Sequence, residues 1–287
     1  MARTLEPYQL VERSIITKYR KVLWNPFIEA VKRYEMIQPG DRIAVCISGG
    51  KDSMLLAKLM QQLQKHSDFP FELVFLVMDP GYNELNRRKI ESNAALLNIP
   101  VTIFESDIFE VADSTGKSPC YLCARMRRGY LYSRAQELGC SKIALGHHFN
   151  DVVETTLISM FYGSQLQAML PKLHSTNFEG MTLIRSLYCV HEDDIIAWAR
   201  DNSLEFIQCA CRLTERSAAD TGDVNVSKRK EIKLLLRRLR QGNPNIEKSI
   251  FNSIHAVALD TMPGFKTGGV EHSFLERFNA MESTEDE

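Results

Sequence analysis

Residues 43–53 constrain the fold of this chain more than any other segment. A short apolar run at 43–47 leads through a serine into Gly49 and Gly50, and an amphipathic stretch follows at 52–64. The apolar run predicts a buried strand and the amphipathic stretch predicts a helix. Glycines between them let backbone N–H groups turn toward an anion, which the helix N-terminus also attracts. The segment therefore predicts a phosphate-binding strand–loop–helix unit.

The same alternation of strand and helix recurs along the chain. Further strands are predicted at 72–78, 101–105 and 142–145, and helices at 84–97 and 151–161. Strands separated by helices of this length are typical of parallel βαβ units. We expect an α/β fold with a doubly wound, mostly parallel sheet and helical additions at both ends. In such a sheet, ligands bind beyond the carboxyl ends of the strands.

The loop at 48–53, Ser-Gly-Gly-Lys-Asp-Ser, is not a Walker A loop, which has four residues between its glycines. It resembles the SGGxDS loop of the PP-loop ATP-pyrophosphatases, which have an adenine nucleotide alpha hydrolase-like fold and cleave ATP between its α and β phosphates. The resemblance implies catalytic roles for Lys51 and Asp52, with Lys51 balancing the charge of the leaving pyrophosphate. It assigns phosphate binding to Ser48, Gly49, Gly50 and Ser53. The alternative is a Gly-Gly turn with a helix-capping Ser or Asp.

Polar residues also follow two other predicted strands. Asp79 is a candidate for holding Mg²⁺ or positioning the base, and the alternative is a turn residue before Pro80. Residues 146–151, Gly-His-His-Phe-Asn-Asp, resemble the GHHxxD segment of the same superfamily. Asp151 is then a metal-binding or acid–base carboxylate, or alternatively a helix N-cap. The residues Gly146 and His147 are candidates for cofactor binding, and for His147 a catalytic and a structural role stay equally open.

Two close pairs of cysteines predict a metal site. Cys120 and Cys123 stand three residues apart at the start of a predicted helix, and Cys209 and Cys211 form a second pair much later in the chain. Two thiolates at this spacing reach one metal, and the second pair can supply a third ligand. Three ligands leave one iron of a [4Fe–4S] cluster open for an exogenous sulfur. The remaining cysteines, Cys46, Cys140 and Cys189, are expected to be buried small residues.

Several motifs together are similar to those of the tRNA 2-thiocytidine biosynthesis (TtcA) family. They are Pro-Cys-Tyr-Leu-Cys-Ala-Arg-Met-Arg-Arg-Gly at 119–129, Ala-Leu-Gly-His-His at 144–148 and Met-Phe-Tyr-Gly at 160–163. The similarity covers roughly residues 35–215. It implies ATP- and Mg²⁺-dependent thiolation of a cytidine in tRNA, with a [4Fe–4S] cluster on three cysteines. In the implied reaction, the C2 carbonyl oxygen is adenylated with release of pyrophosphate, and sulfur then displaces AMP.

The chain departs from the family pattern at two places. The family carries a Pro-Cys-x-x-Cys segment where this chain has Gln-Cys-Ala-Cys at 208–211, so that Cys209 and Cys211 both stay candidates for the third ligand. The family's Ile-Arg-Pro-Leu reads Ile-Arg-Ser-Leu at 184–187, which keeps Arg185. Two alternatives remain: another PP-loop ligase or amidase-type enzyme with structural zinc, and a nucleotide-sensing RNA-binding module.

The expected partners are tRNA and a sulfur donor, either a cysteine desulfurase or sulfide. The formal net charge is −1, so an RNA surface needs locally clustered cations. Arg125, Arg127 and Arg128 and the basic helix at 228–240 are candidates, although solvated helix faces explain them equally well. Neither a signal peptide nor an apolar run of membrane-spanning length is present, which predicts a cytoplasmic protein without membrane contact. Apolar faces predicted for the N-terminal helices are compatible with a homodimer.

The chain is expected to divide into four parts. They are a helical leader at 1–38, the PP-loop domain with the cysteine site at 39–215, a basic helical region at 216–264 and a disordered tail at 265–287.

Overall fold

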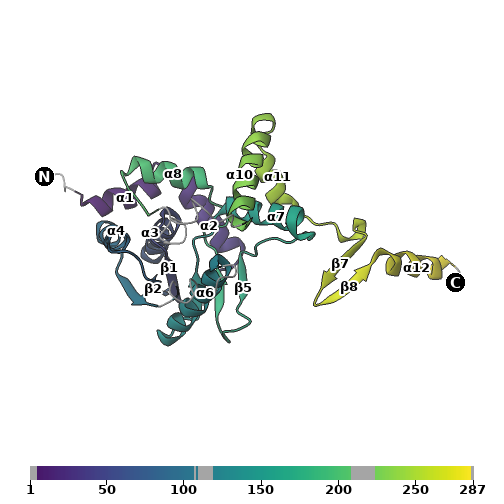
Figure 1. Ribbon diagram of the computed structural model, residues 1–287, viewed down its shortest axis with the longest axis horizontal. Helices are drawn as coiled ribbons and strands as arrows, with labels where there is room; N and C mark the ends of the chain where they lie inside the picture. Colours follow the sequence, from purple (N-terminus) through teal and green to yellow (C-terminus); the bar gives the residue numbers. More distant parts are fainter. Residues whose placement is uncertain (1–4, 107, 109–118, 208–223, 286–287) are drawn as a thin grey trace. The chain divides into compact units, whose positions relative to one another are not determined.

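The computed structural model contains a six-stranded sheet with strand order β3-β2-β1-β4-β6-β5 (Figure 1). The structure describes residues 5–106, 108, 119–207 and 224–285, and side chains within these ranges except at 119–124, 224–227 and 280–285. The first five strands in this order are parallel, and β5 is antiparallel to β6. The strands are β1 (Arg42–Ile47), β2 (Glu72–Asp79), β3 (Val101–Glu105), β4 (Lys142–Ala144), β5 (Lys172–His174) and β6 (Thr182–Ile184). The predicted α/β, mostly parallel fold is confirmed.

Helices cover the sheet on both faces. The crossover helices are α3 (Lys51–His66), α4 (Glu84–Leu96), α6 (Pro119–Glu137) and α7 (Phe149–Gly163). Helix α3 packs on β1 and β2, and α6 packs on β2 and β4. Because parallel crossovers are right-handed, α3 and α4 lie on one face and α6, which crosses in the opposite direction, on the other (Figure 1). Strand β1 is consequently buried on both faces from Ile43 to Ile47, which explains why its sequence is continuously apolar.

The chain reverses its direction across the sheet between β1 and β4. From β1 it proceeds outward to β2 and β3, and it then returns to place β4 and β6 on the other side of β1. Such a reversal opens a crevice at the carboxyl ends of the two central strands. The loops that leave β1 and β4, at 48–50 and 145–148, therefore meet at the position where this fold binds ligands.

The N-terminal helices are fastened to the sheet domain by buried polar contacts. They comprise α1 (Pro7–Ile16), a π-helical turn η1 (Arg20–Trp24) and α2 (Asn25–Arg33). Lys58 of α3 is fully buried, and its Nζ donates to Glu12 Oε1 at 2.7 Å and to the Leu97 carbonyl at 2.8 Å. Helix α8 (Glu192–Asp201) packs on α3 and η1. The predicted helical leader thus packs on the same side of the sheet as α3.

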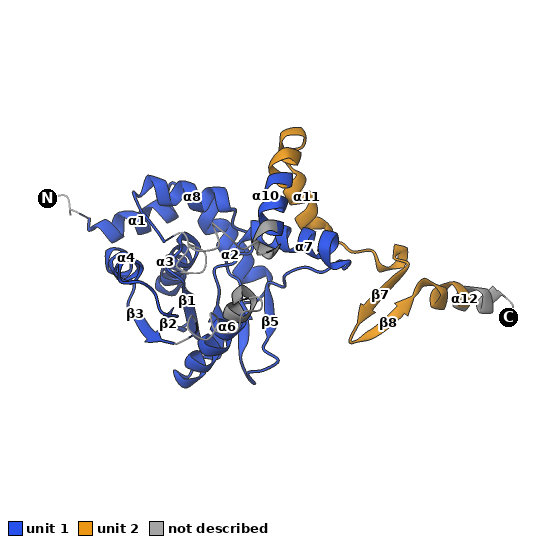
Figure 2. Ribbon diagram, viewed as in Figure 1, with its two compact units in different colours: residues 1–235 blue, residues 236–287 orange. Residues whose placement is uncertain are grey.

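The chain separates into two compact units, residues 1–235 and 236–287 (Figure 2). Helix α10 (Val224–Gly242) crosses the boundary, and α11 (Ile246–Ser253), η2 (Leu259–Thr261), β7 (Gly264–Thr267), β8 (Val270–Ser273) and α12 (Phe274–Glu285) follow. The sequence predicts a disordered tail from residue 265, whereas the structure forms a hairpin and a helix there. The strands have only four residues each, too few for an alternating pattern to be detected. The four proposed domain boundaries stay predictions.

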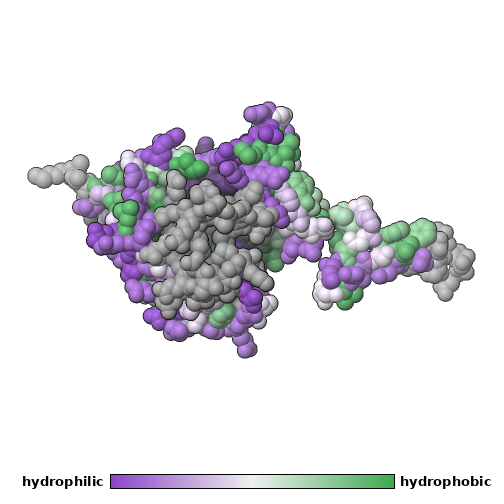
Figure 3. Space-filling view, viewed as in Figure 1, coloured by the Kyte–Doolittle hydropathy of each residue, from purple (hydrophilic) through white to green (hydrophobic). Residues whose placement is uncertain are grey.

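Large apolar side chains lie at the surface of the second unit, as Figure 3 shows on its visible face. Val270, Phe274, Leu275 and Phe278 are each about half exposed. Within the described part of the chain, every helix is too short or too polar to span a membrane.

Candidate active site

The loop after β1 has the geometry of an anion-binding turn. Gly49 has a φ of 83°, and a Cβ placed on it would lie 2.6 Å from Ile90 Cγ1 and 2.7 Å from Ile207 Cδ1. Ser53 Oγ accepts a hydrogen bond from Ser48 N at 3.1 Å and donates to Gly50 O at 2.9 Å. Only glycine fits at position 49, for its backbone angle and for its packing. The serines close the loop against the first turn of α3.

The loop after β4 lies directly against this phosphate loop. A Cβ on Gly146 would lie 3.1 Å from Ser53 N and 3.2 Å from the carbonyl carbon of Asp52, both of them backbone atoms that cannot move aside easily. The parallel register of Val45 with Ala144 brings the two strand ends level. Glycine at 146 is therefore needed for the approach of the two loops.

A cavity of about 490 Å³ lies between these loops, α6 and β6. Its wall contains the predicted residues Ser48, Asp52, Ser53, Gly146 and His147. Three cations also line it: Arg127, Arg128 and Arg185. The sequence motifs that were singled out separately therefore contribute to one cavity, although their individual roles stay predictions.

His147 is a neutral residue within this cavity. Burial, and next the positive charge of Arg185, lower the pKa of its imidazole to about 4. Its Nδ1 is buried and has no hydrogen-bond partner among the described residues. A neutral imidazole at pH 7 offers hydrogen bonding without charge. The catalytic and structural alternatives for His147 both remain open.

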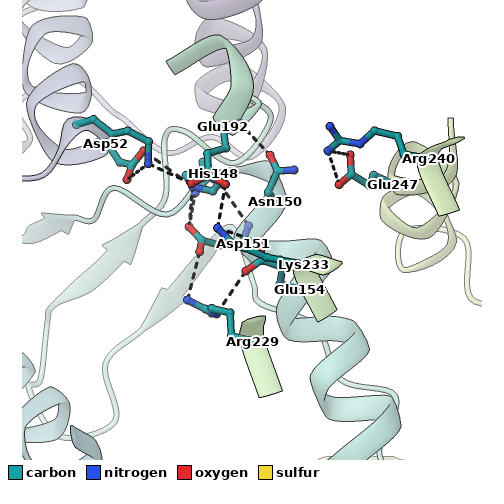
Figure 4. A network of polar contacts seen from close by, with 11 residues as sticks. Asp52, His148, Asn150, Asp151, Glu154, Glu192, Arg229, Lys233, Arg240 and Glu247 are labelled. Atoms are coloured by element: carbon teal, nitrogen blue, oxygen red, sulfur yellow. Dashed lines mark hydrogen bonds and ion pairs between the residues drawn. The ribbon is translucent and has the colours of Figure 1, made fainter. Parts of the chain in front are cut away.

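A charged network that includes Asp52 and Glu192 lies beside the loop (Figure 4), and Lys51 pairs with both of these carboxylates. Its Nζ lies 3.2 Å from Asp52 Oδ2 and 3.1 Å from Glu192 Oε1. Burial disfavours the charged amine, but the charges of Asp52 and Glu192 outweigh it and raise the pKa of Lys51. Glu192 itself is positioned by its backbone N–H, which donates to Asn150 Oδ1 at 2.9 Å. The network therefore keeps Lys51 protonated at the N-terminus of α3.

Asp151, the third residue of α7, closes a capping box with the N-cap residue His148 and also joins this network. His148 N donates to Asp151 Oδ2 at 3.1 Å, and Asp151 N donates to His148 Nδ1 at 3.4 Å. His148 Nε2 lies 3.5 Å from Asp151 Oδ2 and 3.9 Å from Asp52 Oδ1. Arg229 Nη1 lies 3.5 Å from Asp151 Oδ1. Asp151 thus supports the helix start from position N3 and is not itself the N-cap, and a chemical role is compatible with this position.

The basic helix α10 directs two of its cations at carboxylates, as Figure 4 shows. Lys233 Nζ lies 3.0 Å from Glu192 Oε2 and 3.6 Å from Glu154 Oε1, and Arg229 Nε lies 3.4 Å from Glu154 Oε2. Burial raises the pKa of Glu154 to about 7 in spite of both cations. For Glu192 burial acts in the same direction, but the hydrogen bond from Lys233 and the charge of Lys51 lower its pKa to about 2. These two basic residues are therefore engaged within the protein.

Asp79 lies at the end of β2 and is not part of the cavity wall. Its Oδ1 accepts from Gly81 N at 2.9 Å and from Tyr82 N at 2.7 Å, and its Oδ2 accepts from Arg87 Nη1 at 2.5 Å. A carboxylate with three donors in place has little capacity left for a metal ion. The geometry favours the turn alternative for Asp79 over the predicted magnesium role.

The predicted cysteine site falls outside the described side chains. Cys120 and Cys123 occupy the first turns of α6 in the backbone, and Cys209 and Cys211 lie outside the described residues. Of the described cysteines, Cys46 and Cys140 are buried in the core between β1 and α6. Burial raises the pKa of both thiols, as expected for structural cysteines. Across the described ranges no group of three or more His, Cys, Asp or Glu is arranged to hold a metal ion.

Sequence reasoning did not assign roles to His148, Glu192 or Arg185. His148 belongs to the quoted Gly-His-His motif, and Arg185 was noted only as a retained family residue. Glu192 was missed because it begins a helix with three consecutive acidic residues, a common arrangement in a first helical turn. Only the packing of α8 on α3 shows that Glu192 faces Lys51.

Comparisons with known proteins agree with this geometry. A family model described as a PP-loop domain matches residues 17–214. A tRNA-cytidine(32) 2-sulfurtransferase of Geobacter sulfurreducens is 36% identical over 240 residues, which cover 83% of this chain and 90% of that protein. The Alkalilimnicola ehrlichii protein of the same name is 38% identical over 79% of this chain and 70% of its own length.

One solved structure supports the fold alone. The U34-tRNA thiolase NcsA from Methanococcus maripaludis with its [4Fe–4S] cluster superposes with a TM-score of 0.63 at 19% identity, covering 84% of this chain and 80% of that chain.

Proposed function

This chain belongs to the PP-loop family and, within it, to the family of the tRNA-cytidine 2-sulfurtransferases, and from this premise we propose that it thiolates a cytidine of tRNA using ATP. The single observation that carries the proposal is the cavity in which the phosphate loop, Gly146 and His147 meet, on a chain similar to these relatives over 83% of its length. The reaction we propose has two steps, activation of the base and replacement of its oxygen.

In the activation step, the C2 carbonyl oxygen of cytidine attacks the α-phosphorus of ATP. The bond between the α-phosphorus and its bridging oxygen to the β-phosphate breaks, and that oxygen leaves with pyrophosphate. The backbone N–H groups around Gly49 and the start of α3 bind the pyrophosphate, and Lys51 neutralises its growing charge. Sulfide then attacks C2, the bond between C2 and the former carbonyl oxygen breaks, AMP leaves with that oxygen, and the sulfide gives up its proton.

Mg²⁺ fits this site best as an ion that arrives with ATP. Asp52 Oδ1 is buried without a hydrogen-bond partner among the described residues, which suits a magnesium ligand, and Asp151 Oδ2 lies near the same nitrogen of His148, Nε2. Mg²⁺ in such enzymes is held by one or two carboxylates while phosphates and water complete its octahedron. Asp52 and Asp151 are the carboxylates we assign to it.

A [4Fe–4S] cluster, when bound, would supply the sulfur for the second step. We propose Cys120 and Cys123 as two of its ligands, with Cys209 or Cys211 as the third. The three described cysteines support this choice by exclusion, because burial raises the pKa of Cys46, Cys140 and Cys189 and so opposes ligation. The proposed source of the sulfur is free sulfide, or a cysteine desulfurase whose persulfide sulfur is reduced to sulfide by two electrons from thiols.

Nucleoside mass spectrometry tests the proposed function. Cells that lack this gene are expected to lose one thiolated cytidine from bulk tRNA, and the wild-type gene should restore it whereas a Lys51→Met variant should not. An unchanged set of thiolated nucleosides in the deletion strain would contradict the proposal. With purified protein, pyrophosphate release that depends on tRNA would separate the enzyme from a nucleotide-sensing RNA-binding module.

A further inference from the structure

Arg185 presents to the cavity a partly buried guanidinium that has no ion-pair partner among the described residues. It follows β6 directly, and its Nη1 donates to the carbonyl of Leu170. Its Nε is buried and has no hydrogen-bond partner, and none of the ion pairs among the described residues includes Arg185. Burial lowers the pKa of the guanidinium to about 10, which leaves it charged at pH 7.

An uncompensated cation in such a position requires an explanation. Removing a charge from water costs several kcal/mol unless an opposite charge or strong hydrogen bonds replace the solvent. Lys51, at the same phosphate loop, has the carboxylates of Asp52 and Glu192 within 3.2 Å. Among the described residues Arg185 has no carboxylate at ion-pair distance, which favours an anionic ligand of the cavity as its partner.

The sheet register places Arg185 at the same edge of the sheet as the phosphate loop, level with Cys46 and two residues before the level of Ser48. Val45 of β1 pairs with Ala144 of β4, and Ala144 pairs with Ile184 of β6. The residues that follow these three adjacent strands therefore form a row along one edge of the sheet, and the row contains Ser48, His147 and Arg185, all of which line the cavity. Because His147 is neutral, Arg185 supplies the positive charge at its own end of the row.

We propose that Arg185 binds the α-phosphate of ATP and keeps it after pyrophosphate has left. This inference rests on the proposed ATP site in the cavity. The loop at 48–53 would hold the pyrophosphate, and the α-phosphate is the next group along the nucleotide, toward Arg185. The α-phosphate gains negative charge in the transition state and remains attached to the adenylated base. The loop at 48–53 would bind only the departing pyrophosphate, so a second cation is needed at the α-phosphate. A planar guanidinium suits a phosphate with two parallel hydrogen bonds.

Binding of the two halves of ATP tests the assignment. The full-length wild-type protein and its Arg185→Met and Arg185→Lys variants would be titrated calorimetrically with AMP, with pyrophosphate and with tRNA. Arg185→Met is expected to weaken AMP binding by at least tenfold, and Arg185→Lys by less, because lysine keeps the charge but not the fork. Binding of pyrophosphate and of tRNA should stay within twofold. Arg88→Met, which removes an exposed arginine paired with Glu84, is the matched control.

Three results would overturn the assignment. The first is equal AMP affinity of the wild type and Arg185→Met, and the second is a wild type that does not bind AMP. The third is a loss confined to tRNA, which would assign the guanidinium to an RNA backbone phosphate. Retained pyrophosphate binding shows that a variant is folded, and Arg185→Lys carries the test if Arg185→Met fails that criterion.

The outcome is separable from that of the proposed function. Nucleotide binding does not depend on which base is modified, so a normal set of thiolated nucleosides in the deletion strain would remove the thiolation proposal and leave the AMP result standing.

Discussion

The ion pair of Glu192 with Lys51 and Lys233 should contribute measurably to folding. Glu192 has an ordinary pKa of 4.5 and a pKa of about 2 in the folded protein, because the two cations outweigh its burial. That difference corresponds to about 3 kcal/mol of preference for the ionised carboxylate in the folded state. Its side chain is 21% exposed, so that solvent screens it only in part. Glu192→Gln, which cannot ionise, is expected to destabilise the protein by up to about 3 kcal/mol at pH 7.

The pH dependence gives this prediction its sign. A carboxylate whose pKa is lowered by folding stabilises the protein fully above pH 4.5, and the contribution is lost as the pH falls from 4.5 toward 2. The difference in unfolding free energy between the wild type and Glu192→Gln should therefore shrink to less than half at about pH 3.

Urea unfolding followed by tryptophan fluorescence measures this difference. Trp24 and Trp198 are the chain's two tryptophans, and both lie in the first unit together with Glu192. Glu137→Gln is the control, because Glu137 pairs with Arg134 at 2.7 Å but is 56% exposed, and such surface pairs contribute at most about 1 kcal/mol. A cost below about 0.5 kcal/mol for Glu192→Gln at pH 7, or one independent of pH, would refute the electrostatic argument.

Three further predictions concern the loops, the buried acid and the cysteines. Gly146→Ala should lower ATP-dependent pyrophosphate release at least tenfold, because the added Cβ would meet the backbone of Asp52 and Ser53. The control Gly242→Ala has open space around the added Cβ and should keep wild-type activity. Equal activities of the two variants would contradict the argument that the two loops approach closely at Gly146. Burial raises the pKa of Glu154 from 4.5 to about 7, so ionisation of this carboxyl lowers the stability of the folded protein as the pH rises through that range. Glu154→Gln should therefore gain stability relative to the wild type between pH 5 and pH 8. A difference in unfolding free energy between the two proteins that stays constant with pH, measured in urea, would count against this prediction. In protein purified without oxygen, Cys120→Ser and Cys123→Ser should lose iron and acid-labile sulfide, while the core variant Cys140→Ser keeps them. Whichever of Cys209→Ser and Cys211→Ser loses iron identifies the third ligand. Stoichiometric zinc without iron in the wild type would favour the PP-loop ligase alternative.

The fold was predictable because its pattern is local. Strand β1 is apolar throughout since both of its faces are buried, and the amphipathic residues that follow the glycines form α3 as expected. Strand β5 was not predicted, because its three residues include only one apolar side chain, and its pairing with β6 stabilises it instead.

The candidate site was predictable only where a motif carries the chemistry. The phosphate loop and the Gly-His-His segment were found from their residues, and the structure places both on one cavity. For Asp79 the same reasoning failed to distinguish a ligand from a turn residue, since an aspartate before Pro-Gly suits both. Arg87, eight residues later in the chain, occupies its carboxylate in the folded protein.

The sequence by itself determined the order of strands and helices, the glycine loop and the identity of the family, because each depends on neighbouring residues or on short motifs. Only the tertiary structure decided which charges are compensated. The sequence does not distinguish three cations that lie near polar residues, namely Lys51, Arg185 and Arg229. In the structure Lys51 and Arg229 have carboxylates at ion-pair distance, whereas Arg185 has none among the described residues. Sheet order and helix packing bring these distant positions together, and burial then determines how much each ion pair contributes to the free energy of folding.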